Sequence, residues 1–117
     1  MTERDDLRLR HILDAAERIS AYLKGADQGS FLANRMLQDA VIRNLEIIGE
    51  ACVNLSPELL DANADVPWHK ASAIRNRLVH GYFDVDLRVV WQTAKDSVPP
   101  FVLQIAALLD AGKQDDR

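Results

Sequence analysis

Apolar residues recur at intervals of three and four along most of the chain, which is typical of helices that bury one face. The first such helix is expected from about 5 to 24, with an apolar face made of Leu9, Ile12, Leu13, Ala16, Ile19 and Leu23. Asp5 and Asp6 lie at its start, where the helix dipole favours negative charge. Gly25 can take the left-handed conformation and is expected to end the helix.

A second long helix is expected to begin after Ser30 as its cap and to end near Leu55. Its apolar face consists of Leu37, Ala40, Val41, Leu45, Ile48, Cys52 and Leu55. Asn44 lies beside this face and is predicted to be a satisfied core or interface amide. Glu46 and Glu50 share a face because they are four residues apart. They could form a metal or acid–base site, but solvated surface is the preferred interpretation.

Proline and glycine divide the next part of the chain. Ser56 followed by Pro57 predicts a cap and a short helical turn over residues 57–60. A second proline start, Pro67, predicts a third main helix that ends at about His80. Gly81 is expected to close that helix.

Asp86 is the expected cap of a fourth helix, which Pro99-Pro100 should kink or restart because proline lacks an amide hydrogen. The last helical segment is expected to end near Gly112, followed by a frayed polar tail. No strand-like alternation of useful length occurs. We therefore predict an all-α, up-and-down bundle of about four main helices in a single domain, residues 1–117, with its core over about 7–111. The broad apolar faces also indicate an oligomer surface.

Composition narrows the possible settings. The 117 residues suit one domain, and no apolar stretch approaches the ~20 residues that cross a bilayer. With one cysteine no internal disulfide can form, so a cytoplasmic location is expected. Neither Cys52 nor Ser72 has a recognisable base nearby in the sequence, which gives nucleophilic catalysis little support. The net charge of −4 argues against a broad electrostatic grip on nucleic acid, but a local basic cleft remains possible.

The stretch from residue 74 to 83 combines Arg75, Asn76, His80 and Tyr82. Five residues turn a regular helix through roughly 500°, so Arg75 and His80 would lie about 140° apart. Two things could bring them together. The helix can loosen in the turn before Gly81, and a second copy of the chain can complete the site across a two-fold axis; we expect both to act together.

These side chains suit cleavage of an RNA phosphodiester by attack of the 2′-hydroxyl on phosphorus. His80 can transfer a proton near neutral pH, and Arg75 offers a planar set of donors for phosphate oxygens. Asn76 can hold a phosphate oxygen or orient the histidine. The reaction needs both an acid and a base, and a two-fold dimer would supply two copies of His80. The plainer alternative is a salt link and a helix cap.

Other site chemistries have weaker support. His80, Asp84 and Asp86 could ligate a metal, but neither zinc-like nor EF-hand spacing is present. No glycine-rich phosphate loop occurs, so neither a metal nor a cofactor is expected. His11 and His69 are isolated and are interpreted as surface or helix-start residues.

The stretch resembles the signature of the HepT-like family of HEPN-domain proteins, the toxin half of HepT/MntA toxin–antitoxin pairs. That signature is an arginine, four residues, a histidine, one residue and a tyrosine, and it is complete from Arg75 to Tyr82. The resemblance also covers residues 37–41, 44–51 and Pro67-Trp68, and it spans about 7–109.

This resemblance implies a HEPN four-helix bundle that forms a homodimer, with the two motifs meeting in a shared cleft. It implies a metal-independent endoribonuclease in which Arg75 and His80 are catalytic and Asn76 supports them. It also implies a type VII-like toxin–antitoxin system, in which a nucleotidyltransferase antitoxin of the MntA kind neutralises the toxin by transferring AMP to Tyr82.

Two other functions remain open at this stage. The chain could be a non-catalytic helical binding partner of a nucleotidyltransferase, which the negative net charge favours. It could also be a purely structural dimer without nucleotide chemistry.

Overall fold

Helices make up most of the described part of the structure, which is a computed structural model. It describes the backbone of residues 1–80 and 85–115 and the side chains of residues 1–76 and 85–112. The longer helices are α1 (Glu3–Leu23), α3 (Arg35–Val53), α5 (Trp68–His80) and α7 (Val98–Asp115). The shorter elements are α2 (Gln28–Leu32), α4 (Pro57–Ala62), α6 (Leu87–Gln92) and the π-helix η2 (Thr93–Ser97). The prediction of an all-α fold is confirmed, since the described residues contain no strand.

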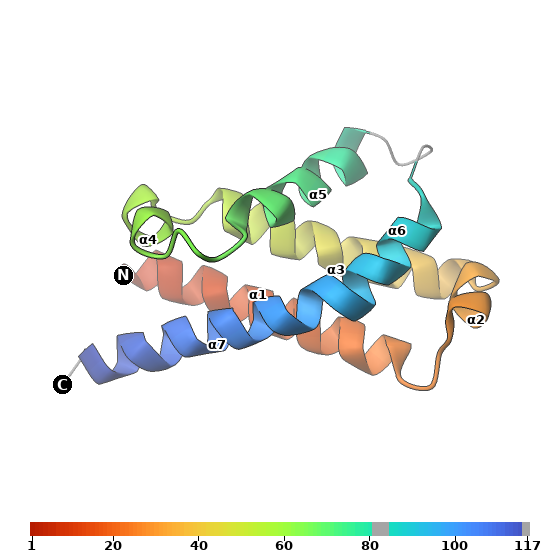
Figure 1. The fold of residues 1–117 in the computed structure, drawn as a ribbon, viewed down its shortest axis with the longest axis horizontal. Helices are drawn as coiled ribbons and strands as arrows, with labels where there is room; N and C mark the ends of the chain where they lie inside the picture. Colours follow the sequence, from red (N-terminus) through yellow and green to blue (C-terminus); the bar gives the residue numbers. More distant parts are fainter. Residues whose placement is uncertain (81–84, 116–117) are drawn as a thin grey trace.

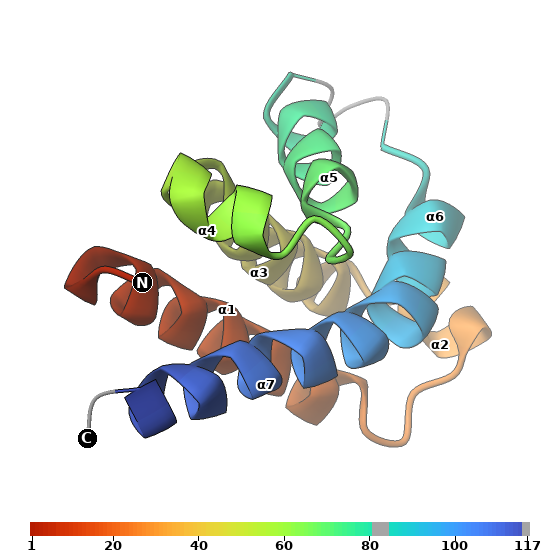
Figure 2. The same cartoon turned by 60° about the vertical axis from the view of Figure 1, so that its left-hand side comes forward.

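The helices pack around α1 and α3, which lie side by side and run in opposite directions (Figure 1). α7 packs along α1, whereas α5 packs mainly on α3 (Figure 2). The largest fully buried apolar side chains come from α1, α2, α3 and α7: Leu9, Ile12, Ile19, Phe31, Val41 and Ile105. In the described part of the chain, no helix combines the length and apolarity that a bilayer crossing requires.

The start of α1 is built around a buried carboxylate, and it differs from the prediction. The helix begins at Glu3, because Thr2 caps it: the Thr2 hydroxyl accepts a hydrogen bond from the amide of Asp5 at 3.0 Å. The Asp5 side chain, only 1% exposed, also accepts hydrogen bonds from the Ser56 amide at 2.9 Å and the Ser56 hydroxyl at 2.6 Å. Asp5 therefore ties the start of α1 to the start of α4, beyond its predicted interaction with the helix dipole.

The other end of α1 agrees with the prediction. Gly25 follows the helix with a φ of 79°, a left-handed conformation that glycine adopts without steric cost. Ser56 and Asp86 cap α4 and α6 as expected, the first through the amide of Leu59 at 3.3 Å and the second through the amide of Arg88 at 2.9 Å.

The predicted single helix from Ser30 is wrong, because two helices occupy that part of the chain. Asp27 caps α2, with Ser30 in its first turn, and Asn34 starts α3 as a new cap. The buried side chain of Gln38 donates hydrogen bonds at 3.0 Å to two carbonyls at the end of α2. These bonds supply donors to the last carbonyls of α2, of which that of Phe31 also accepts from the Asn34 amide at 3.2 Å, so the chain can turn sharply between the two helices.

The predicted restart at Pro99-Pro100 is confirmed, because α7 begins at Val98, the residue before the prolines, although the irregular turn ahead of it was not predicted. A wide turn, η2, precedes the prolines, and the amide of Val98 donates to the carbonyl of Thr93, five residues back. The prolines then fall in the first turn of α7, where a missing amide hydrogen is tolerated. α7 continues to Asp115, past the end predicted near Gly112.

The contact between α3 and α5 depends on Gly49. A Cβ atom at this position would overlap the Cβ of Arg75 and would lie 2.9 Å from the carbonyl oxygen of Ala71. Only a residue without a side chain allows the two helices to approach this closely. Gly49 thereby sets the distance between α3 and the helix that carries the motif arginine.

The first residue of α5 anchors the other end of that helix. The indole of Trp68 is buried, and its Nε1 donates to the carbonyl of Asn63 at 3.0 Å. Its ring meets Phe101 of α7 edge to face, with 6.0 Å between the ring centroids. α5 therefore packs on the rest of the molecule in two places: at its start, through Trp68, and along the face that lies against Gly49 of α3.

Replacing Asp5 by asparagine should lower the free energy of unfolding at neutral pH by roughly 2 kcal/mol, because buried hydrogen bonds to a charged acceptor are lost. Burial raises the pKa of Asp5, but the hydrogen bonds from Ser56 and Thr2 outweigh it and lower this pKa below its ordinary value. A carboxylate with a lowered folded-state pKa stabilises the protein above its unfolded-state pKa of about 4 and loses that effect as the pH falls through the folded-state pKa. Urea unfolding of parent and variant should therefore differ most near pH 7 and converge below about pH 4.

Asp6→Asn is the matched control for this experiment. Among the described residues, the Asp6 side chain pairs with Arg10 alone, an exposed pair with 2.8 Å between Asp6 Oδ2 and Arg10 Nε, so its loss should change stability by less than about 0.5 kcal/mol. Equal losses in the two variants would contradict the structural role assigned to Asp5.

Replacing Gly49 by alanine should destabilise the protein by roughly 1–3 kcal/mol, because the added methyl group forces α5 away from α3. Chemical denaturation measures the loss. Gly29→Ala is the control, since a Cβ there would meet only Asp27 Oδ1, at an ordinary 3.5 Å. Unchanged stability in Gly49→Ala would mean that the two helices separate without cost.

Candidate active site

The motif arginine is held in place on the side of α5 that faces α3. Its Nε donates to Glu50 Oε2 at 2.9 Å, and its Nη1 donates to Asn76 Oδ1 at 3.1 Å. The side chain is 31% exposed, and within the described residues Nη2 makes no hydrogen bond. Arg75 therefore combines a fixed orientation with donors that a ligand can use.

Arg75 opens onto a groove of about 330 Å³ between α1, α3 and α5. The groove is lined by Arg8, His11, Arg43, Glu46, Ile47, Glu50, Ala51, Asn54 and Arg75. The motif predicted only Arg75 among these, and His11 was expected to be an isolated surface residue. His11 is indeed exposed, but the packing of α1 against α3 places it on the same groove as Arg75.

The two carboxylates of α3 that were expected at the surface each face an arginine. Glu46 Oε2 lies 3.4 Å from Arg43 Nη1, and Glu50 forms the 2.9 Å pair with Arg75. Glu50 is 55% exposed and Glu46 is partly exposed, so the surface interpretation holds. Their role in the groove is to position cations and to offset part of the cationic charge.

Asn44 is the core amide that the sequence predicts. Its buried side chain accepts a hydrogen bond from Arg18 Nε at 2.8 Å and donates to the carbonyl of Ala40 at 2.9 Å. Arg18 belongs to α1, so this pair fastens α1 to α3 away from the groove.

Within one chain, the backbone of α5 keeps two residues of the predicted site, Arg75 and His80, apart. The backbone of α5 is helical through His80, so loosening of its last turn is not seen. Five residues on a regular helix separate Arg75 and His80 by about 140°. One copy of α5 therefore places the two on different faces. The side chain of His80 and all of Gly81 and Tyr82 lie outside the described residues.

The alternative chemistries gain no support from the described residues. Burial raises the pKa of the Cys52 thiol to about 12, so the group is protonated at neutral pH and is a poor nucleophile. Among the described side chains, no three of the histidine, cysteine, aspartate and glutamate type gather as metal ligands. Asp84, from the alternative metal set, lies outside the described residues.

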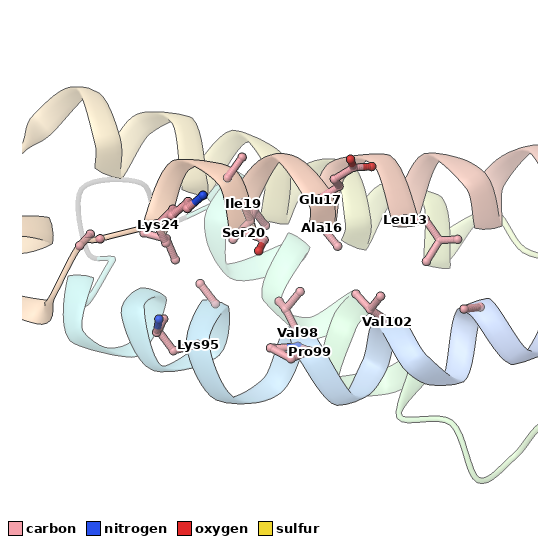
Figure 3. Close-up of a pocket in the computed structure, with 16 residues that line it drawn as sticks. Leu13, Ala16, Glu17, Ile19, Ser20, Lys24, Lys95, Val98, Pro99 and Val102 are labelled. Atoms are coloured by element: carbon pink, nitrogen blue, oxygen red, sulfur yellow. The ribbon is translucent and has the colours of Figure 1, made fainter.

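A larger groove of about 900 Å³ lies between α1 and α7 (Figure 3). Its walls are mainly apolar, with Ile19, Val98 and Val102 among the lining residues, and Lys24 and Lys95 lie at one end. It contains no histidine and no arginine. The smaller groove beside Arg75 is therefore the better candidate for phosphate chemistry.

Comparison with known proteins places the chain in a family. A family model described as ribonuclease HepT-like matches residues 12–108. A Methanocaldococcus jannaschii protein named "Gamma-glutamylcyclotransferase and putative RNase" is 38% identical over 110 residues, and the match covers 92% of this chain but only 50% of that protein. A "Putative RNase" from Caldanaerobacter subterraneus subsp. tengcongensis is 35% identical, with 90% of this chain and 94% of that protein covered.

A third relative, "Probable ribonuclease HepT" from Thermococcus cleftensis, is 38% identical over 91 residues, which cover 78% of this chain and 83% of the relative. No solved structure matches the chain significantly. The family model spans most of the chain, and two of these relatives are covered over most of their length. The chain belongs to the HepT-like ribonuclease family.

Proposed function

We propose that this protein is an endoribonuclease that cleaves RNA without a metal ion, using Arg75, His80 and Asn76. The observation that carries the proposal is the arrangement of Arg75, whose guanidinium is fixed by Glu50 and Asn76 at a groove and keeps donors that bond with no described residue. A permanently charged, oriented guanidinium is the protein group best suited to the equatorial oxygens of a reacting phosphate. Membership of a ribonuclease family supports RNA as the substrate.

In this mechanism Arg75 stabilises the negative charge that builds up on phosphorus, so no bound cation is needed for that role. Glu50 acts through Arg75, since it fixes the direction of the guanidinium. Asn76 accepts from Arg75 through Oδ1, and its amide group makes no hydrogen bond with a described residue. That amide can donate to a phosphate oxygen or to the imidazole of His80.

His80 supplies proton transfer. A base removes the proton of the 2′-hydroxyl while the O2′–P bond forms, and an acid protonates the 5′-oxygen as the P–O5′ bond breaks. The products are a 2′,3′-cyclic phosphate and a 5′-hydroxyl. One imidazole cannot fill both roles in the same step, and one α5 turns Arg75 and His80 to different faces. Both points favour a homodimer in which each chain completes the site of the other.

Neutralisation is proposed to occur at Tyr82. A nucleotidyltransferase antitoxin would transfer AMP from ATP to the phenol oxygen, with release of pyrophosphate. The added phosphate lies two residues from His80 and brings negative charge that competes with RNA for the same donors. The protein would then be the toxin of a type VII-like toxin–antitoxin system, inactive while it carries AMP.

A non-catalytic role as a helical binding partner of a nucleotidyltransferase is the second candidate. The net charge of −4 favours it, because most of the surface would repel RNA at low salt. Both functions predict a nucleotidyltransferase encoded beside this protein. Only the toxin function predicts that this chain alone cleaves RNA and stops growth.

Replacing His80 by alanine should reduce RNA cleavage by roughly two orders of magnitude or more, the usual size of an acid–base contribution. Cleavage of several RNA classes by purified, mass-checked protein in the presence of a chelator measures the effect. His69→Ala is the control, because His69 is an exposed histidine at the start of the same helix. Retained cleavage in His80→Ala would remove the catalytic assignment, and no cleavage by the parent would favour the binding-partner function.

Replacing Tyr82 by phenylalanine should prevent neutralisation without preventing cleavage, because only the acceptor hydroxyl is removed. The neighbouring nucleotidyltransferase and ATP should increase the mass of the parent by one AMP group and abolish its cleavage of RNA. Intact-mass spectrometry and the cleavage assay measure the two effects. Tyr22→Phe, at an exposed tyrosine of α1, should behave like the parent. AMP transfer to Tyr82→Phe would place the modification elsewhere.

A further inference from the structure

We propose that the groove between α1, α3 and α5 binds a second phosphate of the RNA strand, adjacent to the phosphate at which the strand is cleaved. Arg8 and His11 are its ligands. This inference rests on the proposed function. Both residues lie on α1, more than sixty positions before Arg75 in the sequence, yet all three line one groove. A strand whose reacting phosphate lies at Arg75 can therefore continue along α1 without leaving the groove.

The packing of α1 on α3 determines this placement. Asp5 is bonded to Ser56 near one end of the helix pair, and Arg18 is bonded to Asn44 further along it. The helices run in opposite directions, so the turn that carries Arg8 and His11 lies opposite residues 50–54 of α3. Three residues apart on a helix, these two side chains share a face.

Among the described arginines that line the groove, Arg8 is the one that no carboxylate pairs with. Glu46 is paired with Arg43 and Glu50 with Arg75, so each carboxylate already faces an arginine. Arg8 is partly buried, and within the described residues it makes neither a hydrogen bond nor an ion pair. A partly desolvated guanidinium that pairs with no described carboxylate is best satisfied by an anion from outside the chain. His11 beside it adds a ring nitrogen that can donate to the same anion.

The remaining lining indicates what kind of anion fits. Ile47 and Ala51 give the groove an apolar part between the polar side chains, which suits a ribose or an unpaired base. Asn54 also lines the groove, and its Nδ2 donates to the carbonyl of Glu50 at 2.8 Å. A single strand, whose phosphates alternate with apolar and polar groups, matches this surface better than a small free anion.

The test measures RNA binding in the non-cleaving His80→Ala protein, so that the bound strand stays intact. A fluorescein-labelled single-stranded oligoribonucleotide of mixed sequence is titrated, and its anisotropy is followed between about 50 and 200 mM salt. Arg8→Gln should weaken binding roughly threefold to tenfold at low salt. It should also make the slope of log affinity against log salt shallower by about 0.7, the amount expected for one lost phosphate contact with a single strand. Arg8→Lys retains the charge and should retain the slope.

Arg10→Gln is the matched control. It removes the same charge from the same helix, but Arg10 is paired with Asp6 and is not part of the groove. Thermal unfolding of each variant verifies that the fold is retained, and Arg8→Lys covers the case in which Arg8→Gln is unstable. Equal salt slopes in the Arg8→Gln and Arg10→Gln proteins, or no change in either, overturn the inference.

Cleavage of the same oligoribonucleotide by protein with intact His80 separates the two proposals. If that protein cleaves the strand while Arg8→Gln leaves binding unchanged, the proposed function stands and the role of Arg8 is rejected. If it neither binds nor cleaves the strand, the proposed function fails first, and the inference fails with it.

Discussion

The close approach of α3 and α5 at Gly49 is the constraint on which the site depends. Because residue 49 has no side chain, the backbone of α5 lies against α3 at the position of Arg75. The next residue of α3, Glu50, then reaches the guanidinium with a hydrogen bond of 2.9 Å. One dipeptide therefore sets both the position of the motif helix and the direction of its arginine.

Polar bonds at a few buried positions hold the scaffold around this contact. Asp5 joins α1 to the start of α4, and Asn44 joins α1 to α3 through Arg18. Both are buried polar groups, and among the described residues no buried side-chain nitrogen or oxygen lacks a hydrogen-bond partner. With α1 aligned in this way, cations that are remote in the sequence face the same groove as Arg75. The site is thus a property of three helices, although its motif occupies only one.

Much of the fold could be predicted from the sequence because helical periodicity and capping are local properties. The long helices, the caps Ser56 and Asp86 and the left-handed Gly25 follow directly from residues that are neighbours in the chain. The errors occurred where several residues could do the same task. Asp27 and Asn34, not Ser30, cap the helices in the second apolar region. The restart at the prolines was predicted, but nothing local predicts the wide turn η2 that precedes it.

The site was only partly predictable for a related reason. Arg75 and Asn76 belong to one motif, and the structure places them in contact. Glu50 had no local signal that distinguishes it from an ordinary surface carboxylate, and Arg8 had none at all. Their positions depend on how α1, α3 and α5 pack, which is a long-range property. The roles of His80 and Tyr82 stay predictions, since these side chains lie outside the described residues.

Cys52 gives the molecule an internal reporter of its own opening. It is the single cysteine of the chain, it is 2% exposed on α3, and burial raises its pKa to about 12. A thiol reagent therefore reacts with it only when the helices around α3 separate. The rate of labelling follows the frequency of that separation, without any substitution in the chain. The same measurement with and without RNA would reveal how strongly a bound strand holds the bundle closed.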